Sequence, residues 1–313
     1  MAESRDRLLE LLDQGAGSTG SLAAVVESDV ALTLAVLRRA NRDALGSVGG
    51  VPRAVAKLEP AELESIARKV GSFALFTGSW PPGLSPERIG FHALQTRQAG
   101  VQVGAAVSYG SEDELRTAAL LHDVGKVVLA DLGFECPDAH TAPRPQERVA
   151  RERREIGTDH AAVGARALEQ CGIPQVVTHA VAGHHAPSAQ GLAAIVRLAD
   201  MLAHYQQGGP VETGQIFSAA LALGLGRDAL RQVIYSLTYP LPAGASGVEP
   251  CPLSSRELEV VRGLSEGKVY KQIALELGIS VSTVRNHLHR AYGKLDTADR
   301  AQAVLVAAES GWL

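Results

Sequence analysis

The chain has 313 residues, 46% of them hydrophobic, and a formal net charge of -4. This length and composition predict a soluble protein with a substantial core and two or more domains. From Pro252 onward the chain has eight Lys and Arg residues and seven Asp and Glu residues, a net charge of +1. The remaining net charge of -5 on residues 1–251 excludes a general polyanion-binding domain there.

Other global features concern location and redox state. No stretch approaches the about 18 uninterrupted apolar residues of a membrane span, and Met1–Gln14 is charged throughout, without an apolar signal core. We therefore expect a cytoplasmic protein that makes no membrane contact. The three cysteines, Cys136, Cys171 and Cys251, are odd in number and far apart, which favours reduced thiols over a disulfide framework.

Apolar residues recur at helical spacing through residues 1–237, and alternating patterns typical of strands are scarce. We predict an all-α domain of roughly ten helices, with weaker punctuation at Ser79–Pro86 and Cys136–Pro145. The expected helices are Leu8–Leu12, Leu22–Ala40, Ala61–Gly71, Ile89–Ser108, Glu112–Leu129, Glu147–Glu155, His160–Gln170, Gln175–His184, Ala193–Tyr205 and a segment around Arg227–Leu237.

Histidines and aspartates are spread over five of these expected helices. They are His92, the pair His122 and Asp123, His160, the pair His184 and His185, and Asp200. Imidazole and carboxylate groups together suit one or two divalent ions such as Fe, Mn, Zn, Co or Ni. Asp200 lies in the apolar stretch AAIVRLADMLAH, where a buried carboxylate must be paired or bind an ion. Lys126, one turn beyond Asp123, could hold a phosphate oxygen of a metal-bound ligand.

These side chains also have an ordinary structural interpretation. A single histidine in a helical core is usually just hydrogen-bonded, and we assign His140, His179 and His204 to that class. On this interpretation the whole set is a polar cluster that holds the helices in register. The pattern favours the metal site and leaves this alternative open.

Residues 238–252, TYPLPAGASGVEPCP, predict a linker to a second domain at 253–313. Ser254 and Glu257 form a capping box that opens a helix through Leu264, and Gly267 ends it. A second helix is expected at Lys268–Leu277.

Gly278 then supplies the left-handed residue of a tight turn into a third helix, capped by Ser280. A fourth helix is expected at Asp299–Glu309. Its residues Ala303, Val304 and Ala307 would form a docking or dimer surface.

The third helix has the layout of a DNA-recognition helix. Its apolar stripe, Val284, Leu288, Ala291 and Leu295, faces a core, while Ser282, Arg285, Asn286 and His289 lie on the other side. Arg and Asn make bidentate contacts to guanine and adenine in the major groove, so we expect double-stranded DNA as a partner. The alternative is a small helical bundle that binds protein. Because the net charge of +1 gives little phosphate affinity, we expect a homodimer that pairs two copies on adjacent half-sites.

Residues 253–304 resemble the LuxR-type helix-turn-helix family. The matching positions are Leu253, Arg256, Glu257, Val260, Gly267, Ile273, Ala274, Leu277, Ser280, Thr283, Val284, His287, Lys294, Leu295, Arg300 and Ala301. The resemblance implies that Arg285, Asn286 and His289 face bases, and that Lys271, Ser282 and Thr283 touch the backbone. His289 departs from the family, in which Lys is common.

Residues 8–237 resemble the HDOD branch of the HD metallohydrolase superfamily. The HDOD branch is marked by VVESDVALTLAVLRRANR and SVGGVPRAVAKLEPAEL, and the superfamily by AALLHDVGKVVLADLG, EIGTDHAAVGARALEQCGIPQVVTHAVAGHH and AAIVRLADMLAH. The resemblance implies a one-metal or two-metal centre held by His92, His122, Asp123, His160, His184, His185 and Asp200. Many HDOD domains have lost ligands and act as signalling modules, whereas this chain keeps a full set.

Two classes of function follow. The first is a transcriptional regulator whose HDOD-like domain senses a ligand, with a nucleotide as one candidate, and controls the DNA-binding tail. The second is a metal-dependent phosphohydrolase or cyclic-nucleotide phosphodiesterase, with Asp123 and Lys126 in catalytic roles. The Gly-Tyr-Pro segment of related phosphodiesterases is missing after His185, and Arg88 stands where some relatives place the carboxylate of a third metal.

Overall fold

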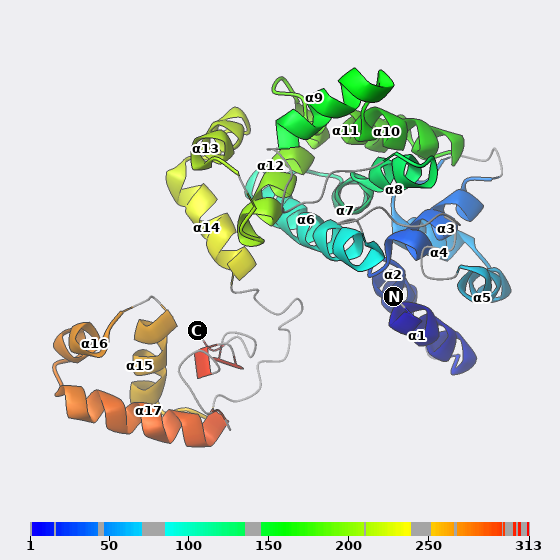
Figure 1. The fold of residues 1–313 in the computed structure, drawn as a ribbon. Coiled ribbons are helices and arrows are strands. Elements are labelled where there is room, and N and C mark those ends of the chain that lie inside the picture. Colours follow the sequence, from blue (N-terminus) through cyan, green and yellow to red (C-terminus); the bar gives the residue numbers. More distant parts are fainter. Residues whose placement is uncertain are drawn as a thin grey trace. The chain divides into compact units, whose positions relative to one another are not determined.

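The computed structural model describes residues 2–15, 17–42, 47–70, 85–134, 145–209, 211–238, 252–265 and 268–295, together with 297, 303–304, 306–307 and 312. Every regular element in these ranges is a helix, as the sequence predicts (Figure 1). The chain divides into two compact units, Met1–Ile234 and Tyr235–Leu313. The expected linker lies almost wholly outside the described residues.

The first unit begins with five short helices and continues with longer ones. The first five are α1 (Ala2–Asp13), α2 (Thr19–Val26), α3 (Val30–Ala40), α4 (Val51–Lys57) and α5 (Pro60–Lys69). The others are α6 (Pro86–Ala106), α7 (Glu112–Leu121), α8 (Val124–Asp131), α9 (Pro145–Ile156), α10 (His160–Gln170), α11 (Gln175–Gly183), α12 (Gly191–Gln206), α13 (Thr213–Ala222) and α14 (Arg227–Thr238).

Two segments that the sequence predicts as single helices are broken. Leu22–Ala40 divides into α2 and α3 because the Asp29 carboxylate accepts hydrogen bonds from the amides of Ala31 and Leu32, which starts a new helix. Glu112–Leu129 divides into α7 and α8 at His122 and Asp123. The predictions also missed α4 and α13.

The core of the first unit lies where α6, α7 and α12 pack together and where α10 packs against α8 and α11. Leu120, Leu121, Leu198 and Leu202 are fully buried there. The break between α7 and α8 therefore falls inside the core, and the polar pair His122 and Asp123 is buried with it.

One buried carboxylate ties the first helices to this core. Glu27 follows α2, is 5% exposed, and lies 3.2 Å from an Arg97 nitrogen on α6 and 3.3 Å from an Arg116 nitrogen on α7. Burial raises the pKa of Glu27, and the two guanidiniums oppose that rise. The end of α2 is thus anchored to two helices that carry candidate site residues.

The second unit is a small bundle of α15 (Ser255–Ser265), α16 (Tyr270–Leu277) and α17 (Val281–Leu295). Gly267, predicted to end the first of these helices, lies outside the described residues. Ala303, Val304 and Ala307 are buried in the bundle's own core, at 0%, 6% and 0% exposure. The prediction that they form a docking or dimer surface is therefore wrong, because this unit already covers them.

No helix in the described ranges combines the length and the apolarity needed to span a membrane.

Candidate metal centre and DNA-binding helix

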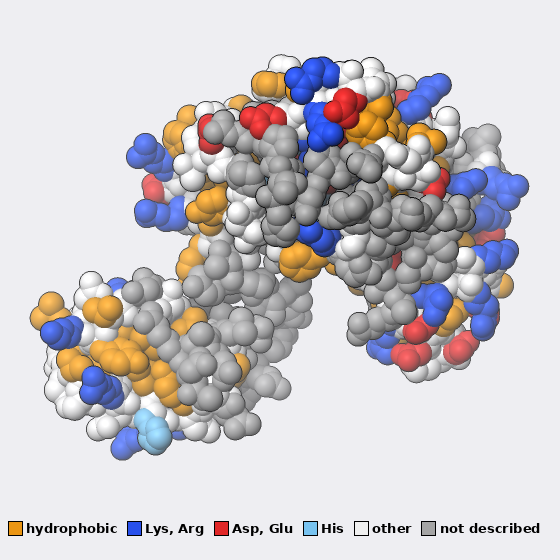
Figure 2. Space-filling model, in the orientation of Figure 1, with side chains coloured by type: hydrophobic (Ala, Val, Ile, Leu, Met, Phe, Trp, Pro, Cys, Tyr) orange, Lys and Arg blue, Asp and Glu red, His pale blue; other side chains and the backbone are white. Residues whose placement is uncertain are grey.

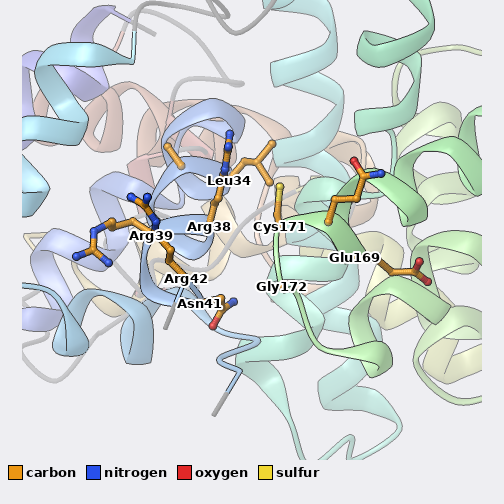
Figure 3. Close-up of a pocket in the computed structure, with 10 residues that line it drawn as sticks. Leu34, Arg38, Arg39, Asn41, Arg42, Glu169, Cys171 and Gly172 are labelled. Carbon is orange, nitrogen blue, oxygen red and sulfur yellow. The ribbon is translucent and has the colours of Figure 1, made fainter. Parts of the chain in front are cut away.

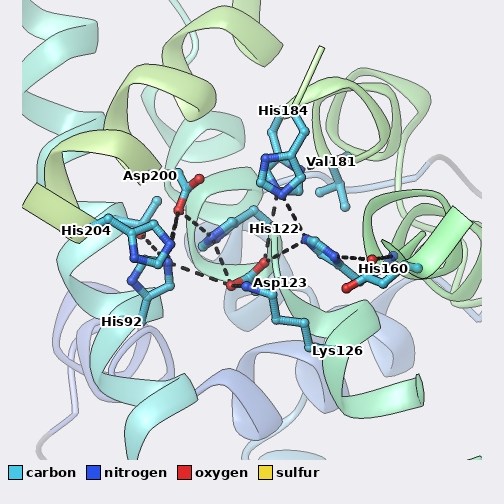
Figure 4. A network of polar contacts seen from close by, with 12 residues as sticks. His92, His122, Asp123, Lys126, His160, Val181, His184, Asp200 and His204 are labelled. Carbon is cyan, nitrogen blue, oxygen red and sulfur yellow. Dashed lines mark hydrogen bonds and ion pairs between the residues drawn. The ribbon is translucent and has the colours of Figure 1, made fainter. Parts of the chain in front are cut away.

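All seven predicted metal ligands meet in the interior of the first unit (Figure 4). They come from six helices or their ends: His92 on α6, His122 and Asp123 between α7 and α8, His160 at the start of α10, His184 and His185 at the end of α11, and Asp200 on α12. The sequence predicts His122 and Asp123 within one helix, whereas they form the junction between two. The junction lets both side chains point into the cluster.

Asp123 lies between two groups of imidazoles. Its Oδ1 is 3.4 Å from His160 Nε2 and 4.0 Å from His184 Nε2. Its Oδ2 is 3.5 Å from His122 Nε2 and 3.7 Å from His92 Nε2. Since each carboxylate oxygen faces a different pair of imidazoles, the arrangement suits a carboxylate that bridges two ions.

The hydrogen bonding of the buried ligand atoms indicates whether a metal ion fits among them. His122 Nδ1 donates to the Ala119 carbonyl at 2.8 Å and His184 Nδ1 donates to the Val181 carbonyl at 2.6 Å. A carbonyl only accepts, so Nδ1 carries the proton and, in the neutral form of each ring, Nε2 carries a free lone pair. Neither Nε2 atom nor Asp123 Oδ1 has a hydrogen-bond partner in the described structure. An unsatisfied buried polar atom costs about 1–3 kcal/mol, and divalent ions bound in the cluster would satisfy all three.

Glu152 orients His160, and the sequence reasoning missed it. Its Oε2 accepts from His160 Nδ1 at 2.7 Å and from the His160 backbone amide at 2.8 Å, and the residue is 1% exposed. Burial raises the pKa of Glu152, but the hydrogen bonds from His160 outweigh it and hold that pKa below its usual value. An ionised carboxylate behind a ligand histidine fixes its tautomer and its direction.

His204 also belongs to the cluster, contrary to its assignment as an ordinary core histidine. Its Nε2 lies 3.3 Å from Asp200 Oδ1, and its ring centroid is 4.4 Å from that of His92. His179, assigned to the same class, is exposed on α11, and His140 lies outside the described residues. The spacing of four residues between Asp200 and His204 on one helix is the signal that could have revealed it.

The charge states of the cluster suit metal ligands. Burial raises the pKa of Asp123 and of Asp200. Lys126 and imidazoles at Asp123, and imidazoles alone at Asp200, outweigh burial and hold both pKa values well below the usual range. Burial lowers the pKa of His184 to about 3 and that of His204 to about 4. Both carboxylates are thus ionised and both of these imidazoles neutral near pH 7.

Two histidines of the cluster have raised pKa values. Burial lowers the pKa of His122 and of His160, but facing carboxylates outweigh it, Asp123 with Asp200 at His122 and Asp123 with Glu152 at His160, so both pKa values lie above the usual value. Protons therefore compete with a metal at these two rings before they compete at His184.

Lys126 is 6% exposed, and its Nζ donates to Asp123 Oδ2 at 2.5 Å. A phosphate oxygen would compete with this carboxylate for the ammonium. The predicted phosphate-holding role of Lys126 stays a prediction.

The approach of His160 to Asp123 depends on two glycines that let α8 and α10 nearly touch. A Cβ atom built on Gly125 would lie 1.8 Å from the His160 carbonyl oxygen and 2.7 Å from the Gly164 amide nitrogen. Only a residue without a side chain fits there. Gly125, two residues after Asp123, thus sets the distance between two parts of the site.

A groove of about 650 Å³ lies elsewhere, between α3 and the end of α10 (Figure 3). Its lining includes Arg38, Arg39, Arg42 and Cys171 and none of the predicted site residues. Cys171 is a free, half-buried thiol whose pKa is raised by burial. Cys136 and Cys251 lie outside the described residues.

The turn into the predicted recognition helix has the expected geometry. Gly278 has φ 64°, in the left-handed region, and ends α16. Ser280 Oγ accepts from the Thr283 amide at 3.1 Å and so caps α17. The capping box of α15 is also present, since Glu257 accepts from the Ser254 amide at 2.7 Å.

The predicted DNA-facing side chains point away from the core of the bundle. Val284, Leu288, Ala291 and Leu295 are buried, as the apolar stripe predicts. Arg285, Asn286 and His289 on the opposite face are exposed, as are Ser282 at the start of α17 and Lys271 on α16, while Thr283 is half-buried. The helix presents donors for base edges on a face free of bundle contacts.

Basic charge on this unit is scattered. Figure 2 shows Lys and Arg side chains dispersed among apolar ones on the face in view, and no single basic patch. Lys268 is paired with Glu276 at 2.5 Å and Lys294 with Glu257 at 2.7 Å, so two lysines are partly neutralised. Phosphate attraction is correspondingly limited.

Comparisons with known proteins agree with both parts of the chain. Residues 1–187 match the HDOD domain family, and residues 251–307 match the family described as bacterial regulatory proteins, luxR family. The spore germination protein GerE of Bacillus subtilis is 46% identical over 61 residues, which cover 20% of this chain and 82% of that protein. The uncharacterized transcriptional regulatory protein YvfU of the same organism is 42% identical over 62 residues, 20% of this chain and 31% of YvfU.

Solved structures share the fold of the larger part. The MmoQ response regulator from Methylococcus capsulatus matches with a TM-score of 0.59 and 22% identity, over 74% of this chain and 95% of that one. A virulence factor from Campylobacter jejuni matches with a TM-score of 0.56 and 14% identity, over 75% of this chain and 88% of that one. This chain spans only about a third of several curated regulators that it matches. The chain belongs to the HDOD family, and its second unit is a LuxR-type DNA-binding helix-turn-helix domain.

Proposed function

We propose that this protein is a transcriptional regulator whose HDOD domain holds one or two divalent ions and controls DNA binding by the helix-turn-helix. The observation that carries the proposal is the set of buried, unpartnered ligand atoms around Asp123, in a chain that also has a DNA-binding helix. A binding site whose occupancy changes the positions of several helices is a reasonable input for such a domain.

The DNA-binding part of the proposal rests on α17. Arg285, Asn286 and His289 would contact bases, and Lys271, Ser282 and Thr283 would contact the backbone. Because the domain has a net charge of only +1, one copy has weak phosphate affinity. A homodimer on two half-sites would supply the missing affinity.

The metal part rests on the donor set. His92, His122, Asp123 and Asp200 would hold one ion, and His160, His184, His185 and the other Asp123 oxygen would hold the second. Imidazoles with carboxylates suit Fe, Mn, Zn, Co or Ni. A ligand that reaches these ions, a nucleotide phosphate among the candidates, would act as the signal.

A second candidate function is metal-dependent phosphoester hydrolysis, favoured by Lys126 beside Asp123, a carboxylate that could be shared by two ions. When bound, two ions supply Lewis-acid activation of a phosphoryl group and of water. In this chain Lys126 would hold a phosphate oxygen, in competition with Asp123 Oδ2. Turnover of cyclic mononucleotides and dinucleotides by the metal-loaded chain would support it, and metal binding without turnover would favour the sensor.

The test measures the affinity of the full chain for duplex DNA selected from a random pool, with chelator and with added Co²⁺ or Zn²⁺. We expect metal to change this affinity by about 5–150-fold, the range of typical allosteric coupling. Asp123→Asn is the matched control, since its DNA affinity should no longer respond to metal. Equal affinity in all conditions would refute control by the metal, and no selectable duplex at low salt would refute DNA binding.

A further inference from the structure

Three imidazole nitrogens converge on a single oxygen of Asp200. His92 Nε2 lies 3.0 Å from Oδ1, His204 Nε2 lies 3.3 Å from it and His122 Nε2 lies 3.6 Å from it. His92, Asp200 and His204 can each place one ligand atom within 4.8 Å of the others. Figure 4 shows the His92 and His204 rings side by side next to Asp200.

His204 is positioned by its helix to take part. It follows Asp200 by one turn on α12, so both side chains leave the helix on the same side. Its side chain is 18% exposed, compared with 5% for Asp200, so the ring lies at the outer edge of the cluster.

The Gln207 side chain contacts the His92 ring on the side away from Asp200. His92 Nδ1 lies 3.2 Å from the Gln207 side-chain nitrogen, which also donates to Gln95 Oε1 at 2.5 Å. Nδ1 is therefore engaged away from Asp200, and only Nε2 faces the cluster. This contact fixes the direction of the ring. An ion at Nε2 would require the proton to lie on Nδ1, with the Gln207 amide turned so that its oxygen accepts from Nδ1.

A hydrogen bond from His204 to Asp200 is the simpler explanation of their contact. Asp200 Oδ1, however, already has His92 Nε2 at the shorter distance of 3.0 Å, and the His204 contact is not short enough to be a strong charge-assisted bond. The ligand atoms of His92, Asp200 and His204 instead lie close enough to one another to surround a shared ion.

We propose that His204 is a direct ligand of the ion held by His92, His122 and Asp200, an assignment that rests on the proposed metal centre. The ligand atoms of His92, Asp200 and His204 lie within 4.8 Å of one another, and His122 Nε2 lies 3.6 Å from the same Asp200 oxygen, so this ion would have three imidazole donors and one carboxylate. Such a donor set selects a first-row transition ion such as Fe²⁺, Co²⁺, Ni²⁺ or Zn²⁺ over Mg²⁺ or Ca²⁺. It also leaves fewer open positions than a catalytic site keeps, so this ion is better suited to sensing than to substrate activation.

The experiment compares the full chain, His204→Ala and the control His179→Ala, which changes an exposed histidine on α11. Each protein is loaded with Co²⁺, and bound metal is measured by elemental analysis and by titration. Proton NMR of the loaded protein counts the strongly shifted exchangeable ring protons, one for each coordinated imidazole. We expect two ions in the wild type and in His179→Ala. In His204→Ala we expect at least about tenfold weaker binding of one ion and one fewer shifted proton.

His204→Asp separates a ligand from a structural residue. An oxygen ligand in this position should restore the second ion and shift its preference from Co²⁺ toward Mn²⁺, which a merely structural histidine would not do. If the wild type binds two ions while His204→Ala keeps both affinities and all shifted protons, only the assignment of His204 is overturned. If the wild type binds no metal, the proposed metal centre fails with it. Should His204→Ala not fold, the His204→Asp preference decides, and an unchanged Co²⁺ to Mn²⁺ ratio overturns the assignment.

Discussion

Replacing Gly125 with Ala would force α8 and α10 apart at the point where they nearly touch. The new Cβ atom would lie 1.8 Å from the His160 carbonyl oxygen, whereas real Cβ contacts are essentially never under 3.0 Å. The two backbones must therefore separate by about 1.2 Å, the difference between these two distances. Because His160 is the first residue of α10, its ring moves with the helix, away from Asp123.

The expected cost follows from two opposing effects. Alanine is favoured over glycine in a helix by up to about 1 kcal/mol, while overpacking in a close-packed core costs about 1–3 kcal/mol, and sometimes more. The atoms that the new Cβ would meet belong to the backbone and not to a flexible side chain, so the cost of overpacking exceeds the gain in helix propensity. We expect the free energy of unfolding to fall by about 1–2 kcal/mol. For a domain of this size that lowers Tm by roughly 2–8 °C.

The metal readout is sharper than the stability readout. Metal–ligand distances tolerate only about ±0.2 Å, so a displacement of His160 by about 1.2 Å should remove it as a ligand. Calorimetric titration with Zn²⁺ is expected to show at least about tenfold weaker binding of one ion. Gly214→Ala is the control, since a Cβ atom there meets nothing within 4 Å. If Gly125→Ala melts and binds Zn²⁺ as Gly214→Ala does, the close contact does not position the site.

Three further predictions concern DNA, protons and metal removal. Arg285→Ala should weaken binding to the selected duplex by about 1–3 kcal/mol, or about 5–150-fold, if it makes a bidentate base contact. Arg256→Ala, an exposed arginine on α15 paired with Glu259, should stay near wild type, and equal effects of the two would contradict the assigned face. Metal affinity should fall as the pH drops through the raised pKa values of His122 and His160, because protons then occupy the ligand nitrogens. Zn²⁺ titrations between about pH 8 and pH 5 test this, and a constant affinity would contradict it. Removal of metal by a chelator should lower the Tm of the HDOD unit and leave the Tm of the LuxR-type unit unchanged. A ligand at about 100 times its Kd stabilises the folded state that binds it by about 2.7 kcal/mol. If calorimetry shows both unfolding transitions unaltered by the chelator, a structural metal is contradicted.

The LuxR-type domain was largely predictable because its signals are local. The capping box at Ser254, the left-handed Gly278 and the apolar stripe of α17 each involve residues within a few positions of one another, and all three were confirmed. The surface role of Ala303 and Val304 was not predictable in the same way. Helical periodicity shows that a face is apolar, but not whether the same domain or a second molecule covers it.

The cluster in the HDOD domain was predictable in its residue types and not in its geometry. Its members come from helices far apart in sequence, so only the family resemblance indicated that they converge. Glu152 lies among the charged residues of α9, where an exposed and a buried carboxylate look alike in sequence. His204 could have been inferred from its spacing to Asp200, but a single histidine on an apolar helix is usually ordinary.

The break between α7 and α8 was missed for a related reason. The segment around His122 and Asp123 is apolar on both sides, and periodicity continues across the junction without a glycine or proline before it. The break is set by tertiary packing, which places both side chains in the core of the domain. The most important local feature of the site is therefore one that local patterns do not show.

The two-ion centre can be tested by anomalous scattering from crystals of the full chain grown with Zn²⁺ or Co²⁺, measured at the absorption edge of the metal. We expect two peaks, one on each side of the Asp123 carboxylate, separated by about 3.5–4 Å as in other two-metal sites. The peak nearer His92 should also lie within bonding distance of Asp200. A map with no peak inside the cluster, or with metal only at surface histidines, would contradict the account.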